Sequence, residues 1–345
     1  MDNIGLLKQS ESQDTFDICP GIEDHFKLAY SRFIIQLSAI ELTKLPLYKG
    51  STIRGAFGHA FRAIVCTNRL KPCHECQQNA ECAYARVFET VPPPDSEIMR
   101  NYPNVPHLFI IEPPLNGKKD FLPDELIEYQ LILLEPALKY LPIFILAFER
   151  MGHQGLGADR GRFQLKRVFE EGSQSERLIY SSTDRIIKDH LVKPKLLSFP
   201  KPKKKIRKIR VTFLTPTRLK YGNKLVSTPE FQILLTNLLR RISLLNYFYG
   251  NQENPKLNYR GIIDSALSIK IEKLEIKWQD WERYSSRQKR KIQMGGLVGN
   301  VDYFGEINPY LPLLKMGEII HIGKGAVFGL GKYQIQVLEE GINEV

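Results

Sequence analysis

The chain has 345 residues, of which 43% are hydrophobic and 25% are charged, the composition of a soluble globular protein with room for two domains. Its formal net charge of +11 and its pI near 9.3 favour a polyanionic partner such as nucleic acid. We find neither a secretory signal nor a run of about twenty apolar residues, so we expect a cytoplasmic protein with no membrane partner.

The first half of the chain alternates between strand and helix patterns. Residues 1–27 are polar and predict an N-terminal extension, and a strand, a helix, two strands, a helix and a strand follow it. This βαββαβ order is typical of a ferredoxin-like domain and of the RRM-like sheet that binds single-stranded RNA. The expected elements are strands at 32–40, 107–112, 126–134 and 163–168, and helices at 51–66 and 137–150.

The second half is predicted to repeat this order more loosely. Residues 196–208 are rich in proline and lysine and indicate a basic linker between a first domain, 28–195, and a second domain, 209–345. We therefore expect an α+β fold of tandem ferredoxin-like domains. The expected elements are a strand at 210–214, a helix at 229–248, strands within 262–278, a basic turn leading into a strand within 283–305, a short helix at 307–318 and a final strand at 333–337.

A glycine-rich loop near the C-terminus is the first candidate binding site. An apolar run, 319–322, enters it and the alternating run 333–337 leaves it, which predicts a hairpin. Its bare backbone with Lys324 and Lys332 could crowd a phosphate, although a mobile hairpin tip is the alternative. A second glycine-rich turn, 152–161, opens the last strand of the first half. The four glycines of the C-terminal loop are Gly323, Gly325, Gly329 and Gly331.

Four of the five cysteines fall in one insertion, residues 66–82. Two of them form a CxxC pair, and the other two flank it closely enough to complete a tetrahedral site. In a reducing compartment this spacing favours a structural zinc, with an iron–sulfur cluster or unligated thiols as alternatives. Cys19 stands alone and is expected to be an incidental thiol. The predicted metal ligands are Cys66, Cys73, Cys76 and Cys82.

Several stretches together resemble one known family. They include YKGSTIRGAFGHAF, GLGADRGRFQL and LLKMGEIIHIGKGAVFGLG, and they extend from about residue 30 to residue 337. Their order and combination are similar to the RAMP superfamily and, within it, to the CRISPR-associated endoribonuclease that processes precursor CRISPR RNA (the sixth Cas protein).

This resemblance implies metal-independent cleavage of repeat RNA. A ribose 2′-hydroxyl would attack the adjacent phosphodiester and leave a 2′,3′-cyclic phosphate and a 5′-hydroxyl, without any cofactor for the reaction. The alternative is a non-cleaving RNA-binding subunit of a CRISPR effector complex. A metal-dependent nuclease is disfavoured because no cluster of Asp and Glu at metal-ligand spacing is present.

The candidate catalytic residues are three histidines and two residues that could support them. His59 lies off the apolar stripe of the first helix, His74 lies among the cysteines, and His321 lies before the glycine loop. Lys324 would stabilise charge, and Tyr48 would orient the sugar or simply pack. The predicted RNA contacts are Lys49, Arg54, Arg62, Arg160, Arg162, Lys203, Lys204, Lys205, Arg287, Lys289, Arg290, Lys324 and the four loop glycines.

The sequence leaves the substrate and assembly open. It does not tell which repeat is recognised, whether the RNA is folded or linear, whether the protein forms a homodimer, or whether the product is handed to an effector complex.

Overall fold

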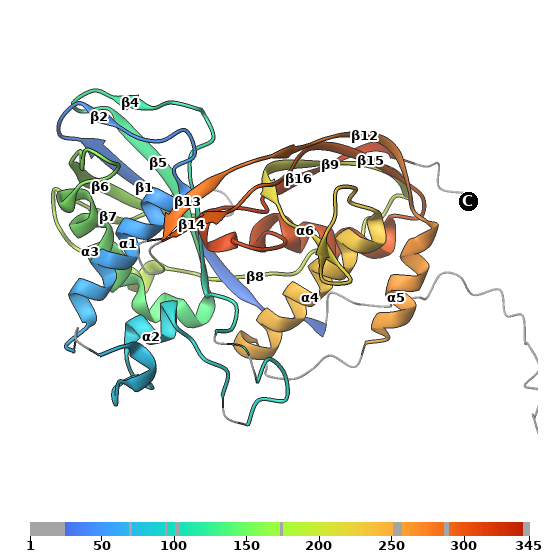
Figure 1. Ribbon diagram of the computed structural model, residues 1–345, viewed down its shortest axis with the longest axis horizontal. Helices are drawn as coiled ribbons and strands as arrows, with labels where there is room; N and C mark the ends of the chain where they lie inside the picture. The colour runs from blue at the N-terminus through green and yellow to red at the C-terminus, as the bar shows by residue number, and fades with distance from the viewer. Residues whose placement is uncertain are drawn as a thin grey trace, which may run out of the picture.

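A computed structural model gives the fold, and it describes residues 25–68, 71–93, 95–100, 102, 104–172, 175–250, 257–285 and 290–340. Cys19, Arg287, Lys289 and most of the expected N-terminal extension lie outside these ranges. The chain forms two units, each with its own sheet, and they lie side by side in Figure 1.

The first unit is a ferredoxin-like domain with additions. Its sheet has the strand order β3-β5-β1-β6-β7, with β8 also paired to β1, and every pairing is antiparallel. The alternation of apolar residues predicted this βαββαβ order. Its elements are β1 (Ala29–Ala39), β2 (Thr43–Lys44), α1 (Gly50–Val65), α2 (Ala83–Phe88), β3 (Phe109–Glu112), β4 (Asp120–Phe121), β5 (Leu126–Leu134), α3 (Leu141–Gln154), β6 (Phe163–Glu171), β7 (Glu176–Ser181) and β8 (Lys195–Leu196).

The second unit repeats the same strand order. Its sheet runs β12-β15-β9-β16, so the second, third, first and fourth strands of the motif are neighbours, as in the first unit. The predicted tandem ferredoxin-like fold is therefore confirmed. Its elements are β9 (Ile206–Thr217), β10 (Lys220–Tyr221), β11 (Lys224–Leu225), α4 (Phe231–Tyr249), α5 (Tyr259–Ser265), β12 (Lys270–Gln279), β13 (Glu282–Ser285), β14 (Arg290–Gln293), β15 (Gly296–Phe304), α6 (Leu311–Ile320) and β16 (Tyr333–Glu340).

Two predicted elements of the second half are wrong. The start of the 262–278 region belongs to α5 rather than to a strand, because its short apolar pattern suits a single helical turn as well. The apolar run at 319–322 does not enter a hairpin. Ile319 and Ile320 complete α6, so the glycine loop follows a helix and leads into β16.

Aromatic side chains fill the core of the first unit. Phe57 of α1 stacks on Phe148 of α3 at 4.5 Å, and Phe61 and Phe88 add edge contacts at 5.3 to 5.7 Å. These rings fix α1 and α3 on one face of the sheet, because aromatic residues bury large apolar areas in preferred geometries.

The opposite face of the first sheet is covered in part by the second unit. Ile110 and Ile132, on β3 and β5, pack against Ala326 of the glycine loop. The Tyr249 hydroxyl of α4 donates to the carbonyl of Pro106, shortly before β3, at 2.5 Å. The glycine loop therefore lies between the two units.

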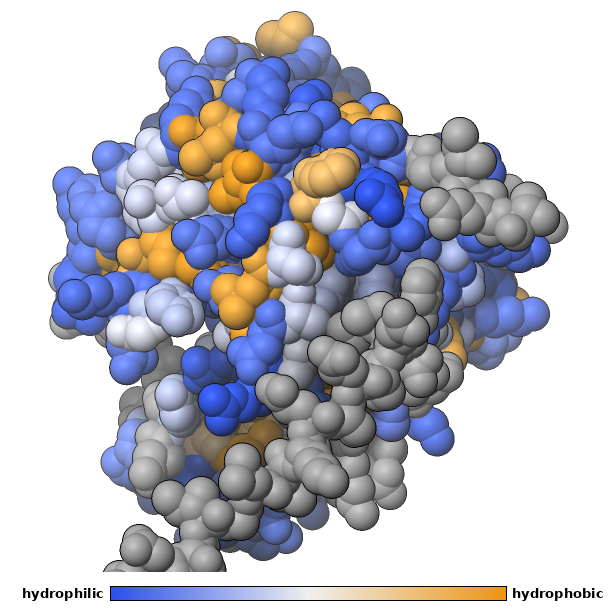
Figure 2. All heavy atoms as spheres, turned by 90° about the vertical axis from the view of Figure 1, so that its right-hand side faces the viewer, coloured by the Kyte–Doolittle hydropathy of each residue, from blue (hydrophilic) through white to orange (hydrophobic). Residues whose placement is uncertain are grey.

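The face at the right-hand side of Figure 1 is largely hydrophilic. Figure 2 shows that hydrophobic residues form a few patches there among hydrophilic ones. In the described ranges no helix is both long and apolar enough to cross a membrane.

Candidate functional site

The C-terminal glycine loop is tightly folded. Its four glycines have φ angles of 74° to 87°, a region that side chains other than glycine rarely adopt. A Cβ at Gly331 would stand 1.8 Å from the carbonyl oxygen of Ile322, and one at Gly323 would stand 2.5 Å from that of Arg218. The bare backbone therefore serves close packing within the protein.

The same loop is attached to the start of α1. The Tyr48 hydroxyl donates to the carbonyl of Phe328 at 2.6 Å, and burial raises the pKa of Tyr48 well above its usual value. A Cβ at Gly50 would stand 2.0 Å from that carbonyl oxygen. The Arg54 guanidinium lies 5.4 Å from the Phe328 ring centre, in cation–π contact. The Tyr48 hydroxyl is thus engaged within the protein, and its role towards the sugar stays a prediction.

The segment from Thr43 to Gly50 connects the two glycine-rich loops. A Cβ at Gly157 would stand 2.7 Å from the carbonyl oxygen of Lys44, and one at Gly161 would stand 2.1 Å from the Thr43 hydroxyl oxygen. The first loop thus packs against the start of this segment, and the C-terminal loop packs against its end.

His59 lies on the exposed face of α1. Its side chain is exposed, and in the described ranges no hydrogen bond or ion pair involves its imidazole. One turn earlier, a Cβ at Gly55 would meet nothing within 4 Å. A Cβ at Gly58, by contrast, would stand 3.4 Å from the Phe88 ring of α2. The imidazole therefore stands on an open strip of helix surface.

His321 is in the opposite situation. It is fully buried directly after α6, its Nδ1 lies 3.0 Å from the Leu330 carbonyl oxygen, and its Nε2 lies 2.7 Å from Oε1 of Glu112. Both partners accept hydrogen bonds, so both ring nitrogens must donate, which requires the protonated imidazolium. A histidine held in this form has no free nitrogen for a general base.

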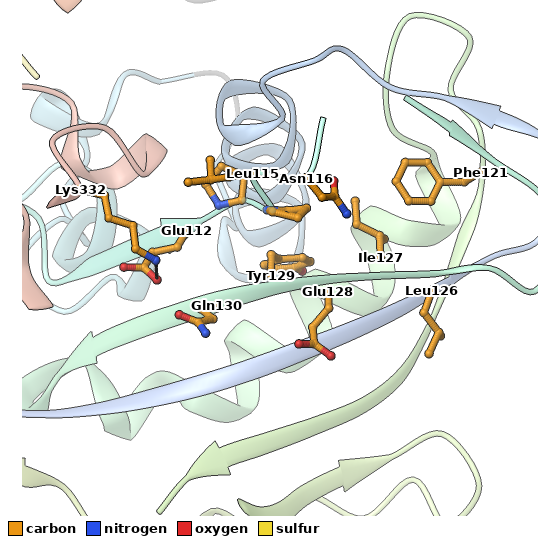
Figure 3. Close-up of a pocket in the computed structure, with 12 residues that line it drawn as sticks. Glu112, Leu115, Asn116, Phe121, Leu126, Ile127, Glu128, Tyr129, Gln130 and Lys332 are labelled. Atoms are coloured by element: carbon orange, nitrogen blue, oxygen red, sulfur yellow. Dashed lines mark hydrogen bonds and ion pairs between the residues drawn. The ribbon is translucent and has the colours of Figure 1, made fainter. Parts of the chain in front are cut away.

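Glu112 and Lys332 complete a buried charge cluster with His321. The other carboxylate oxygen of Glu112 lies 2.8 Å from Nζ of Lys332, an ion pair drawn in Figure 3. Burial by itself raises the pKa of Glu112, but the hydrogen bond and charge of His321 and the charges of Lys332 and Arg32 outweigh it and lower the pKa to about 2. This cluster ties β3 of the first unit to α6 and β16 of the second.

The cysteine insertion forms an irregular surface segment. The four thiols are free and partly buried, and His74 pairs with Glu75 at 3.2 Å on the exposed side. Burial raises the pKa of Cys73, and the charges of Cys66 and Cys82 act on it in the same direction. These thiols are neighbours, yet no three potential ligands in the described ranges are arranged to hold one metal ion. The zinc site stays a prediction.

Four cations gather beside the glycine loop. Lys324 is exposed, and burial together with the charges of Lys220, Arg218 and Arg240 lowers its pKa. Asn237 of α4 bonds both the N–H and the carbonyl of Lys220, at 3.2 and 2.9 Å, and Arg240 follows one helical turn later. In the described ranges none of the four pairs with a carboxylate. This four-cation cluster is a surface suited to phosphate groups.

The remaining predicted contacts have varied surroundings. Lys49 is fully buried and donates to the Leu47 carbonyl at 3.3 Å, so its ammonium group does not reach the surface. Arg162 forms an ion pair with Glu41, and Lys205 with Glu306. Arg62 lies over the Tyr84 ring at 5.6 Å and bonds the Cys66 thiol. The exposed side chains among the others are Arg160, Lys203, Lys204 and Arg290.

Sequence reasoning missed Glu112 and three of the four clustered cations. Glu112 ends a short apolar strand, and nothing in its local pattern indicates a partner 209 residues away. Arg218 and Lys220 lie in residues 215–220, which read TPTRLK. Two basic residues beside a strand end were the feature of the sequence that could have indicated this cation cluster.

Comparisons with known proteins agree with this fold. Residues 211–333 match the family model described as CRISPR-associated endoribonuclease Cas6, and residues 27–192 match a model described as an N-terminal domain. A protein of Archaeoglobus fulgidus, named only as uncharacterized, is 26% identical over 296 residues, which cover 85% of this chain and 93% of that protein.

Solved structures of Cas6 proteins share the architecture. A Cas6 product complex matches with a TM-score of 0.52 and 14% identity, covering 89% of this chain and 99% of the other. Thermus thermophilus Cas6 matches with a TM-score of 0.50 and 12% identity, covering 90% and 99%. A chain of a partial Cas6-RT-Cas1–Cas2 complex matches with a TM-score of 0.51 and 12% identity, covering 92% of this chain and 47% of that one.

Proposed function

We propose that the chain is the endoribonuclease that cuts precursor CRISPR RNA within the repeats, because residues 211–333 match the Cas6 family model and the fold is that of solved Cas6 structures. The cut releases guide RNAs with 2′,3′-cyclic phosphate and 5′-hydroxyl ends. The observation that carries this proposal is the exposed imidazole of His59 on the open face of α1, which has no hydrogen-bond or ion-pair partner among the residues that the structure describes.

The reaction needs two proton transfers. The 2′-oxygen attacks the phosphorus while its proton passes to a base, and the bond to the 5′-oxygen breaks as that oxygen receives a proton. An imidazole suits either step near neutral pH. His59 is free for this role, whereas both nitrogens of His321 are engaged and His74 is paired with Glu75.

Positive charge must hold the RNA and stabilise the transition state. We assign the backbone phosphates to the four-cation cluster, which offers four basic side chains that pair with no carboxylate of the described residues. Arg62, one turn after His59 on the same helix, is the cation that we assign to the developing phosphorane charge. The reaction uses no metal ion or other cofactor.

The test is cleavage of the cognate repeat in the presence of EDTA. We expect wild-type protein to cut, and a single 2′-deoxy substitution at the cut site to abolish cutting. Cutting that survives this substitution would exclude the 2′-hydroxyl mechanism. Binding without any product would instead assign the protein to the non-cleaving RNA-binding subunits.

Parallel variants identify the histidine. His59→Ala should lose cleavage by about 10²-fold or more while keeping RNA affinity, because it removes a proton-transfer group. His153→Ala is the matched control, since His153 is also exposed on a helix of the first unit. His74→Ala and His321→Ala complete the set, and full activity of His59→Ala would refute the assignment.

A further inference from the structure

An exposed tyrosine, Tyr102, stands beside the four-cation cluster. It lies in the loop between α2 and β3, and 51% of the residue is exposed. Its backbone N–H donates to the Met99 carbonyl at 2.9 Å, which holds it in place within the loop. Among the residues that the structure describes, its ring stacks on no other ring and its hydroxyl makes no hydrogen bond. The ring is therefore open to a ligand.

The loop of Tyr102 is attached to one face of α4. The backbone N–H of Glu97 donates to the Tyr247 hydroxyl at 3.3 Å, and Figure 1 shows the loop beside the C-terminal end of the helix. Asn237, which bonds the backbone of Lys220, Arg240 and Tyr247 follow one another at intervals of one and two helical turns, so they share that face. The face thus presents two of the clustered cations and then the loop.

The C-terminal glycine loop brings the other two cations to the same place. Gly323 packs against the carbonyl oxygen of Arg218, and Nη1 of that arginine donates to the Gln293 carbonyl at 2.9 Å, which orients the guanidinium. Lys324 follows Gly323 directly. Burial and the neighbouring cations lower the pKa of Lys324, whereas Tyr102 raises it, in agreement with a ring placed beside this ammonium group. One surface therefore carries four cations and an open aromatic ring.

This combination suits a single-stranded nucleic acid better than a duplex. Cations hold the phosphate groups of either form, but a protein ring can stack only on a base whose face is uncovered. In a duplex the neighbouring base pairs cover both faces of each base. Stacking on an aromatic side chain accepts any base, because every base has a π-face.

Resting on the proposed function, we propose that Tyr102 and the four-cation cluster together bind an unpaired stretch of the repeat RNA. The phosphates lie on the cations, and one base stacks on the Tyr102 ring. Tyr221, which is 60% exposed, is outside this site, because it follows Lys220 on β10 and successive side chains of a strand point to opposite faces.

The experiment couples changes in the RNA to changes in the protein. Repeat RNAs with an abasic site at one position at a time are titrated by fluorescence anisotropy against wild type, Tyr102→Ala and Tyr102→Phe. For wild type we expect one position where the abasic site weakens binding about five- to tenfold, the effect of one lost stacking contact.

The two variants should then differ in a defined way. Tyr102→Ala should bind the intact repeat about five- to tenfold more weakly and show no further loss with the abasic site at that position, because both changes remove the same contact. Tyr102→Phe keeps the ring and should behave as wild type. Tyr221→Ala, at the exposed tyrosine on the other face of β10, is the matched control and should keep both the affinity and the position effect.

A fluorescent base gives a direct reading of stacking. With 2-aminopurine at the same position, binding to wild type and to Tyr102→Phe should quench the fluorescence of the base, and binding to Tyr102→Ala should not. Equal quenching by all three proteins would overturn the stacking contact.

The outcomes separate this inference from the proposed function. Wild-type protein that binds and cuts the repeat, with the same affinity and position effects in Tyr102→Ala, overturns the stacking site and leaves the nuclease standing. An equal loss of affinity in Tyr221→Ala also overturns it. Failure of wild type to bind the repeat overturns both proposals. Because the ring is exposed, Tyr102→Ala should melt at the temperature of wild type, which excludes unfolding as the cause of its weaker binding.

Discussion

Replacing Glu112 by glutamine should test the buried charge cluster directly. The amide keeps an acceptor for His321 but places an uncharged group beside the Lys332 ammonium. Lowering the pKa of Glu112 from its ordinary 4.5 to about 2 corresponds to about 3 kcal/mol of folding stability, similar to the usual cost of breaking a buried ion pair. We therefore expect Glu112→Gln to lower the free energy of unfolding by about 3 kcal/mol at neutral pH.

The pH dependence makes this prediction sharper. The folded-state pKa lies below the unfolded one, so the stabilisation is complete above about pH 4.5 and is lost as the pH falls towards 2. Urea titrations from pH 7 to 3 should show the difference between wild type and Glu112→Gln shrinking over that range. Glu128→Gln, on the exposed surface of the next strand, should change little at any pH. A Glu112→Gln variant as stable as wild type at pH 7, or a difference independent of pH, would refute the reasoning.

Three further predictions concern the cations, the glycines and the cysteines. Lys324→Ala and Arg218→Ala should each reduce the slope of log affinity for RNA against log salt concentration by about one. Lys273→Ala is the control and should leave the slope unchanged, because Lys273 pairs with Glu275 on β12. Equal slopes in all three variants and wild type would contradict a phosphate site. Gly331→Ala should destabilise the protein by at least about 2 kcal/mol, because the added Cβ would meet a carbonyl oxygen. Gly55→Ala, at the open helix position, should stabilise the protein by about 1 kcal/mol. A melting temperature of Gly331→Ala above that of Gly55→Ala would refute this. Metal analysis of freshly reduced protein should find about one zinc per chain, lost in a Cys73→Ser Cys76→Ser variant, and metal-free protein would end the zinc prediction.

The fold was predictable where long segments have a clear period. The strand expected at 126–134 matches β5 residue for residue, because the alternating residues 126–130 lead directly into a continuous apolar run. The prediction of a strand-like entry at 319–322 was wrong, because a short apolar stretch fits a buried helix end and a strand equally well. The helix at 259–265 was not predicted for a similar reason, since seven residues are too few to show the helical period.

The site was predictable only in part. The exposure of His59 could be predicted because its neighbours define an apolar stripe that it does not join, which is a local property of one helix, and its catalytic role stays a prediction. The partners of His321 could not be found, since Glu112 lies 209 residues away and pairs with it only through the packing of two units. Lys49 shows the opposite error: a lysine beside a glycine looks exposed in sequence, yet the fold encloses it.

The backbone at His321 has a consequence for how RNA would be received. Its φ of 60° and ψ of 172° lie in a region that is almost restricted to glycine and costs about 1 to 3 kcal/mol for other residues. A glycine here would relieve that cost, and the side chain that stands in its place makes two buried contacts, to Glu112 and to the Leu330 carbonyl. On the proposed function, RNA would meet a surface already shaped by this junction, and the entropy lost on association would fall mainly on the nucleic acid.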